Sequence, residues 1–264
     1  MYGVAHLAQI PMRAAAVESA EMVSQLLFGD VYQVVEETAQ WLKIAACDCN
    51  YEGWINRKSF NPLHDDDVET YLKAEKYMLK DWLLFIREFE TNITFPIFCG
   101  SSFPYPENEL LILGNAIFMI QLPENKIFKG NNQLSAQQET MLRFASTYLN
   151  APYLWGGRTP AGIDCSAFTQ LIFKSIGSAI PRDASQQVEC GVLVDFISEA
   201  QVGDLAFFQN EEGVIVHVGM ICGKDKIIHS SGKVRIDKLD ETGIFDTATG
   251  QYTHTLRLIK HLKI

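Results

Sequence analysis

One cysteine of the chain stands where a thiol could be made reactive. Cys165 follows the loop W-G-G-R-T-P-A-G-I-D and precedes apolar residues at helical spacing that run to Gly177. This spacing predicts a helix with one buried face and a glycine stop, in whose first turn Cys165 lies. The free N–H groups and the dipole at a helix start stabilise a thiolate, so we expect a lowered pKa for this thiol. The alternative is a small buried side chain, which is the usual environment of a free cysteine.

Two of the six histidines fall in one predicted β-hairpin and could supply a general base. Its strands are V-I-V-H-V-G-M-I and K-I-I-H-S-S, which carry His217 and His229. A turn centred on Gly223 would set the two imidazoles opposite each other on one face, with Cβ atoms roughly 5 Å apart. A two-residue turn at 224–225 would shift the register and spoil this pairing. Since a nucleophile, a base and an orienting group form a triad, we predict a site made of Cys165 and both histidines.

Several motifs resemble, in their order, the NlpC-type branch of the papain-like cysteine peptidases. They are P-Y-L-W-G-G-R-T-P-A-G-I-D-C-S-A-F, P-R-D-A-S-Q-Q, G-D-L-A-F-F and H-V-G-M, and the similarity covers about residues 134–264. Members of this family hydrolyse bacterial cell-wall peptides. The resemblance implies an α+β fold with a papain-like catalytic domain, in which helices pack on an antiparallel sheet. It also places His229 at the position of the family's third catalytic residue.

The N-terminal half of the chain has the pattern of small β-barrels. Short strand-like runs broken by turn residues predict a first barrel, and S-E-M-V-S-Q-L-L-F-G-D-V-Y-Q-V-V-E with Y-E-G-W-I resembles the bacterial SH3-like barrels that accompany these peptidases. A helix over residues 65–78 and further strands favour a second, divergent barrel before a polar linker at 123–132. Ser135 begins a capping box that opens the next predicted helix. The predicted organisation is an SH3-like barrel over residues 1–62, a helix with a second barrel and linker over 63–125, and the peptidase domain over 126–264.

The resemblance implies roles for further polar residues. Tyr153 would join the Cys165 N–H in stabilising an oxyanion, although it could equally pack against the helix. Asp164 could cap the helix, but its charge would raise the thiol pKa unless a cation compensates. We therefore expect Asp164 to receive the free N-terminal amine of a peptide substrate, as in related enzymes that recycle cell-wall peptides. The other residues expected to bind substrate are Ser166 and Ser185 in the peptidase domain, and Glu21 and Tyr51 in the barrel, which could equally be solvated rim residues.

The expected activity is that of a γ-D-glutamyl-L-diamino acid endopeptidase that acts as a dipeptidyl-peptidase on freed murein peptides. His217 would take the Cys165 proton, the sulfur would attack the γ-carbonyl of D-glutamate, and water would resolve the acyl-enzyme. An imidazolium and a thiolate would coexist, which predicts a bell-shaped pH profile. Two alternatives are a related thiol amidase or acyltransferase that shares Cys165 and His217, and a non-catalytic binder of cell-wall peptides.

Composition fits a globular enzyme with an accessory part. The chain has 264 residues and a net charge of -10, which argues against nucleic acid and anionic membranes as partners. It has no run of about 18 uncharged apolar residues, so we expect no membrane span. The start M-Y-G-V-A-H lacks a signal-peptide pattern, so we expect a cytoplasmic monomer if Met1 is native, and a periplasmic or surface location if a signal was trimmed. The six cysteines form no disulfide framework, and the Cys47-x-Cys49 pair has no second pair for zinc, so we expect no metal and no cofactor.

Overall fold

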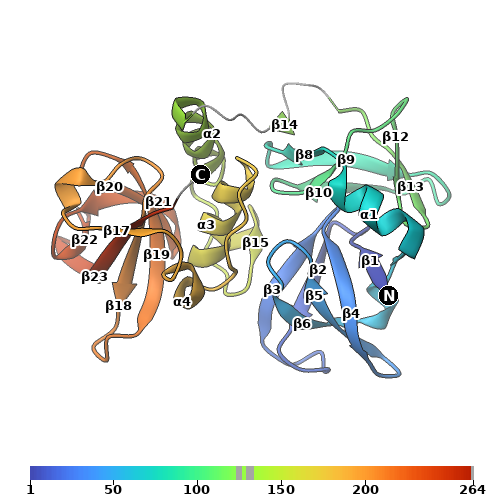
Figure 1. The fold of residues 1–264 in the computed structure, drawn as a ribbon, viewed down its shortest axis with the longest axis horizontal. Coiled ribbons are helices and arrows are strands. Elements are labelled where there is room, and N and C mark those ends of the chain that lie inside the picture. Colours follow the sequence, from blue (N-terminus) through green and yellow to red (C-terminus); the bar gives the residue numbers. More distant parts are fainter. Residues whose placement is uncertain (123–126, 129–133, 263–264) are drawn as a thin grey trace. The chain divides into compact units, whose positions relative to one another are not determined.

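The computed structural model describes residues 1–122, 127–128 and 134–262. The chain divides into two compact units (Figure 1). The first consists of Met1–Lys129 with Trp155–Pro160, and the second of Gly130–Leu154 with Ala161–Ile264. The predicted linker at 123–132 lies outside the described residues, apart from 127–128.

A seven-stranded antiparallel sheet begins the first unit, with strand order β3-β2-β6-β5-β4-β1-β7. Its interior is apolar, and Ile10, Leu26 and Leu42 are fully or almost fully buried there. The apolar run over residues 3–10 reads as one strand in the sequence, but the chain leaves the sheet at residues 5–8 between two separate strands. The elements are β1 (Tyr2–Val4), β2 (Gln9–Arg13), β3 (Met22–Leu27), β4 (Val31–Glu37), β5 (Trp41–Ala46), β6 (Glu52–Asn56), the short helix η1 (Arg57–Ser59) and β7 (Pro62–Leu63).

Two smaller sheets complete the first unit, with strand orders β10-β9-β13-β12 and β11-β8-β14. The helix predicted over 65–78 ends at Lys73, because K-Y-M-L at 76–79 forms a strand that pairs with Ser102–Pro104. The elements are α1 (Asp65–Lys73), β8 (Lys76–Leu79), β9 (Leu83–Glu88), β10 (Thr94–Phe98), β11 (Ser102–Pro104), β12 (Leu110–Leu113), β13 (Ala116–Met119) and β14 (Ile127–Phe128).

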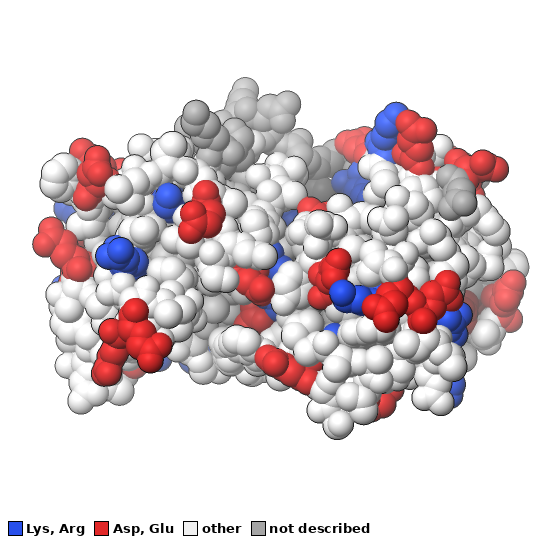
Figure 2. All heavy atoms as spheres, turned by 60° about the horizontal axis from the view of Figure 1, so that its bottom comes forward, with Lys and Arg blue, Asp and Glu red and all other residues white. Residues whose placement is uncertain are grey.

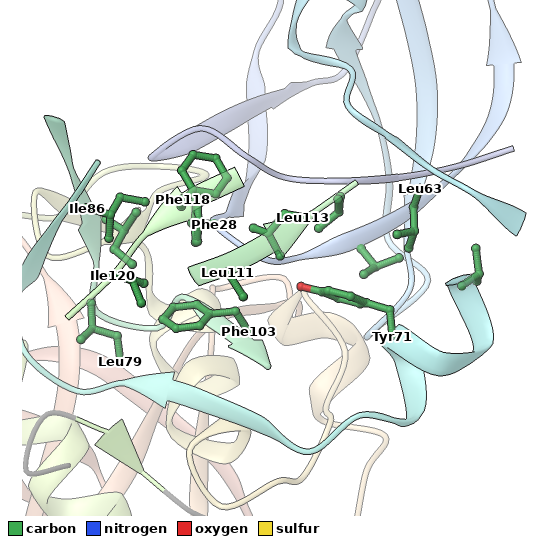
Figure 3. Packing of buried hydrophobic residues seen from close by; sticks show 14 residues of the cluster. Phe28, Leu63, Tyr71, Leu79, Ile86, Phe103, Leu111, Leu113, Phe118 and Ile120 are labelled. Atoms are coloured by element: carbon green, nitrogen blue, oxygen red, sulfur yellow. The ribbon is translucent and has the colours of Figure 1, made fainter. Parts of the chain in front are cut away.

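A shared apolar cluster holds the sheets of the first unit together (Figure 3). Phe28 directly follows β3, and its ring meets Phe103 and Phe118 edge to face, with centroids 5.7 and 5.0 Å apart. Such pairs add to the free energy gained by burying the rings. The first sheet and the smaller sheets therefore share one core.

Arg158, in the segment Trp155–Pro160, is buried within the first unit. Its side chain is 2 % exposed and donates a hydrogen bond of 2.8 Å to the Gln25 carbonyl. The guanidinium also lies 3.1 Å from the Asp30 carboxylate. Removing one partner of a buried ion pair is strongly destabilising, so this arginine anchors the segment.

The second unit contains helices on an antiparallel sheet, which confirms the predicted α+β fold. The sheet order is β17-β23-β18-β19-β20-β21-β22, and β23 also pairs with β22, so that six of these strands close into a ring. Helix α3 packs against β19 and β20, and Phe168 of α3 contacts Tyr148, which follows α2. The predicted cap at Ser135 is wrong, because α2 already includes this residue.

The remaining elements position the groups described below. They are α2 (Leu134–Thr147), β15 (Arg158–Thr159), β16 (Gly162–Ile163), α3 (Cys165–Lys174), α4 (Ala184–Gln187), β17 (Val192–Val194), η3 (Ile197–Glu199), β18 (Leu205–Gln209), β19 (Ile215–Gly223), β20 (Lys226–Ser231), β21 (Lys233–Leu239), β22 (Gly243–Asp246) and β23 (Gln251–His261).

The described surface agrees with the acidic composition. On the face drawn in Figure 2, acidic side chains are interspersed with basic ones, and the described residues form no continuous basic patch there. In the described part of the chain, no helix has the length and apolar character needed to cross a membrane.

Candidate active site

Cys165 is the first residue of α3, and Asp164 is its N-cap. The Asp164 carboxylate accepts a hydrogen bond of 2.8 Å from the Ala167 N–H, so the predicted helix cap is confirmed. The cysteine is only 7 % exposed. The sequence therefore places this thiol at a helix start, as predicted, but in a largely buried environment.

Burial decides the protonation state of the Cys165 thiol. It raises the pKa to about 12, and the Asp164 charge acts in the same direction. The backbone N–H of Val218, the Arg182 charge and the N–H of Ser166 lower the pKa but do not offset the burial. The expectation of a lowered pKa is therefore wrong, because desolvation of the thiolate outweighs the helix start. The resting side chain is a neutral thiol at neutral pH.

Arg182 is the cation that offsets the Asp164 charge. Its Nη1 and Nη2 lie 3.1 and 2.5 Å from the two carboxylate oxygens, and both side chains are buried. Nη1 also donates to the Ser166 hydroxyl at 2.9 Å, and this hydroxyl donates to Asp164 at 3.3 Å. The structure thus brings the predicted Asp164 and Ser166 together, whereas Ser185 is exposed on α4.

The two predicted histidines lie on one face of the β19–β20 hairpin. A turn centred on Gly223 would have made His217 the direct partner of His229. Instead Gly219 pairs with His229, so His217 is the diagonal neighbour of His229. The turn is the two-residue one at 224–225, and a bulge beside it shifts the register by one residue. His217 Nε2 still lies 2.9 Å from His229 Nδ1, so the two rings can hydrogen-bond.

His217 is available as a base at neutral pH. Burial lowers its pKa well below 6.5, and the charges of His229 and His254 act in the same direction. The imidazole is therefore neutral at neutral pH. The N–H of Val218, the next residue along β19, acts on the Cys165 sulfur, so the thiol lies against this strand.

Tyr153 lies on the loop that precedes the nucleophile. Its N–H donates to the Gly232 carbonyl at 2.9 Å, and it forms an isolated parallel bridge with Ile163. Burial raises the pKa of its phenol to about 12, with the Cys165 and Asp164 charges acting in the same direction. The hydroxyl therefore stays protonated at neutral pH, as a donor to an oxyanion must be.

The two barrel residues expected to bind substrate lie in the first unit. Glu21 accepts a hydrogen bond from the indole N–H of Trp155. Tyr51 is half-buried and packs against the core of the first sheet. Their contacts with substrate stay predictions.

Three residues of the site were not singled out from the sequence. Arg182 stands within the motif P-R-D-A-S-Q-Q, where it could have been proposed as the compensating cation. Asp237 accepts a hydrogen bond of 2.9 Å from His229 Nε2. On β21 this charged residue is buried while the neighbouring apolar Ile236 is exposed, which reverses the usual pattern of a strand. His254 stacks on His217 with ring centroids 4.2 Å apart. The contact of Asp237 with His229 depends on the register of neighbouring strands, which sequence spacing alone does not define.

The described residues contain no metal centre. Among residues 1–122, 127–128 and 134–262, no group of three or more His, Cys, Asp or Glu side chains could hold an ion. The chemistry that the site supports is acyl transfer to a thiol, with an imidazole base and a phenol donor.

Comparison with known proteins places this site in a class. Residues 150–253 match the NlpC/P60 family, and residues 12–60 match the bacterial dipeptidyl-peptidase Sh3 domain. In sequence order, the chain thus carries an SH3-like barrel followed by an NlpC/P60 domain, and it is a cysteine peptidase.

Particular relatives cover most of the chain. A γ-D-glutamyl-L-lysine dipeptidyl-peptidase of Bacillus subtilis is 28% identical over 240 residues, which span 83% of this chain and 76% of the relative. Dipeptidyl-peptidase 6 of Lysinibacillus sphaericus is 25% identical, with 84% and 86% covered. The crystal structure of an NlpC/P60 family protein from Bacillus cereus shares the fold, with a TM-score of 0.81 over 99% of both chains at 19% identity.

Proposed function

We propose that the protein cleaves the bond between γ-D-glutamate and an L-diamino acid in murein peptides that carry a free N-terminal L-alanine. The relatives named γ-D-glutamyl-L-lysine dipeptidyl-peptidases support this bond, because their similarity extends over both the barrel and the peptidase sequence. The observation that carries the proposal is the contact between His217 and His229. His217 lies on β19, the strand whose Val218 N–H acts on the Cys165 thiol.

The reaction begins from a neutral thiol and a neutral imidazole. As the Cys165 sulfur attacks the γ-carbonyl carbon of D-glutamate, its proton moves to His217. The Tyr153 hydroxyl and the Cys165 N–H donate to the developing oxyanion. His217 then protonates the leaving α-amine of the diamino acid, the C–N bond breaks and a thioester remains. Water, activated by His217, attacks the thioester, and L-alanyl-D-glutamate leaves as the thiol is restored.

Asp164 is the proposed anchor for the substrate's free amine. The described hydrogen bonds of this carboxylate place three donors at Oδ1 and one, from Arg182, at Oδ2, so the ammonium group is proposed to bind on the Oδ2 side. Arg182 holds this carboxylate beside the nucleophile and offsets its charge. An amine bound here would place the second residue of the peptide at Cys165, which would make the enzyme a dipeptidyl-peptidase. Ser166, Ser185, Glu21 and Tyr51 are the further proposed substrate-binding residues.

Paired peptides test the proposal. The substrates are L-Ala-γ-D-Glu-L-Lys and its diaminopimelate counterpart, each with a free and an acetylated N-terminus, and mass spectrometry follows the products. We expect the free peptides to yield L-Ala-D-Glu, and acetylation to lower kcat/KM by at least about 30-fold, since losing one partner of a buried charge pair costs roughly 2 kcal/mol or more.

Asp164→Asn is the matched variant, because it keeps an oxygen for the helix cap and removes the charge. It should cleave free and acetylated peptides at similar, low rates. Equal cleavage of both peptides by the wild-type enzyme would contradict amine recognition. If no peptide is cleaved while the wild-type protein and Cys165→Ala bind it equally well, the protein is a binder.

A further inference from the structure

A line of three buried polar groups crosses the sheet behind the nucleophile. It runs from His217 on β19 through His229 on β20 to Asp237 on β21, with successive contacts of 2.9 Å. His229 pairs directly with Arg235, so Asp237 is its diagonal neighbour, just as His229 is the diagonal neighbour of His217. The three side chains belong to residues that are 5, 1 and 8 % exposed. The repeated diagonal step therefore sets one continuous chain of hydrogen bonds.

We propose that Asp237 is a positioning residue that fixes the protons of both imidazoles, so that His217 presents an unprotonated Nδ1 to the Cys165 thiol. The proposal rests on the peptidase chemistry of Cys165 and His217, and it concerns the direction of the hydrogen bonds behind them.

The direction follows from what each group can donate. An ionised carboxylate only accepts hydrogen bonds, so His229 must carry its proton on Nε2. A neutral imidazole has one N–H, which leaves His229 Nδ1 as an acceptor. This atom then accepts from His217 Nε2–H, and His217 Nδ1 is left free to take a proton. Were the His229 bond reversed, His217 Nδ1 would already be protonated and the base would be inactive.

Arg235 keeps Asp237 in its accepting form. The guanidinium lies 2.7 Å from Oδ2 and donates to Oδ1 at 2.8 Å. Burial alone would raise the pKa of Asp237, but the hydrogen bonds from His229 and Arg235 hold it below its ordinary value. The carboxylate is thus negative when His217 becomes positive during attack, and it favours that charge through His229. His254 is the further titratable group that acts on the two imidazoles, and Asp246 faces Arg235 at 3.1 Å.

Asp237→Leu should leave the direction of the hydrogen bonds unset. It removes the carboxylate whose Oδ2 contacts both His229 and Arg235, so nothing then holds the His229 proton on Nε2. His217 can then carry its proton on Nδ1, where it cannot take the thiol proton. We expect kcat to fall by up to about 10⁴-fold, the loss seen when a wrong tautomer is imposed on a catalytic histidine, with KM little changed. A kcat within a few-fold of wild type would overturn the proposal.

A second substitution separates this role from a structural one. In an Arg235→Met background, Asp237→Asn still offers His229 an oxygen that can accept, whereas Asp237→Leu offers none. We expect the Asn double variant to keep the higher kcat. Both double variants lack the Arg235 ion pair, so equal kcat values would point to a structural role and overturn the proposal.

Asp246→Asn is the matched control, because Asp246 is the other carboxylate on Arg235. It should retain the wild-type kcat. If it loses as much activity as Asp237→Leu, the Arg235 ion pairs matter and the proton positions do not.

Nitrogen NMR of ¹⁵N-histidine-labelled full-length protein gives a readout that needs no substrate. The wild type should show His217 protonated on Nε2 only, and Asp237→Leu should show a fraction of it protonated on Nδ1. Wild-type His217 protonated on Nδ1 would overturn the proposal even if the peptidase is active. The correct tautomer in a protein that cleaves no murein peptide would leave this proposal standing while the proposed function fails.

Discussion

At the scale of single residues, the site works with neutral groups. Burial raises the pKa of Cys165 and lowers that of His217, so both directions favour the uncharged pair over a thiolate and an imidazolium. The positive charge of Arg182 offsets that of Asp164, so the carboxylate raises the pKa of the Cys165 thiol less than it would without this partner. The stacked His254 has its pKa lowered to about 4 by burial and by the His229 charge, so it covers His217 as a neutral ring. The proton therefore moves only as the carbonyl is attacked.

The neutral pair predicts the pH dependence of kcat/KM. The neutral base form of His217 exists above its lowered pKa and is lost as the pH falls through it, so the acid limb should lie well below pH 6.5. The thiol stays protonated up to about pH 12. For peptides with a free amine, the alkaline limb should lie near pH 8, where an α-amino group of pKa about 7.7 to 8.0 loses its charge.

Initial rates between pH 4 and 10, with ultraviolet absorbance as a measure of thiolate, check this prediction. An acid limb at or above pH 6.5, with thiolate absorbance already present at pH 7, would show that the resting enzyme holds an ion pair.

At the scale of elements, the hairpin β19–β20 determines whether the histidines meet. Gly219 lies opposite His229, and a Cβ there would come within 2.8 Å of the His229 Cβ and 2.7 Å of the Ile227 Cδ1. The bulge beside the turn then sets the diagonal step between the rings. Glycine at 219 is therefore required by the close approach of the imidazole.

Gly219→Ala should displace His229 from His217. We expect kcat to fall roughly 10²-fold, the effect of a misplacement of about 1 Å, and stability to fall by roughly 1–3 kcal/mol from overpacking. Gly223→Ala in the same strand is the matched control, since a Cβ there meets nothing within 4 Å. Steady-state kinetics and thermal unfolding of both variants measure the effect. Equal losses in the two would show that the hairpin tolerates no side chain and that the His229 contact is not the cause.

Local patterns predicted the elements of the site better than its contacts. The apolar spacing after Cys165 predicts the helix, and the run K-I-I-H-S-S predicts β20 with its observed bounds. The helix at 65–78 was overextended, because the short strand β8 depends on pairing with residues 102–104. Asp237 was missed because its contact with His229 depends on the register of three strands, which a single bulge shifts.

At the scale of the whole molecule, the proposed chemistry is contained in one unit. Cys165, His217, Tyr153 and Asp164 all belong to the second unit, which also supplies the supporting arginine and aspartate. The first unit carries the SH3-like barrel matched over residues 12–60. The net charge is -10, and acidic side chains are interspersed with basic ones on the face in Figure 2.

Trapping of the acyl-enzyme tests the central claim most directly. With hydroxylamine present, its nitrogen competes with water for the thioester carbonyl, the C–S bond breaks and Cys165 returns to the thiol. Mass spectrometry of the reaction with L-Ala-γ-D-Glu-L-Lys should detect the γ-hydroxamate of L-Ala-D-Glu with the wild-type enzyme and none with Cys165→Ala. Cleavage that yields only L-Ala-D-Glu at every hydroxylamine concentration, or hydroxamate formed by Cys165→Ala, would contradict a thioester at Cys165.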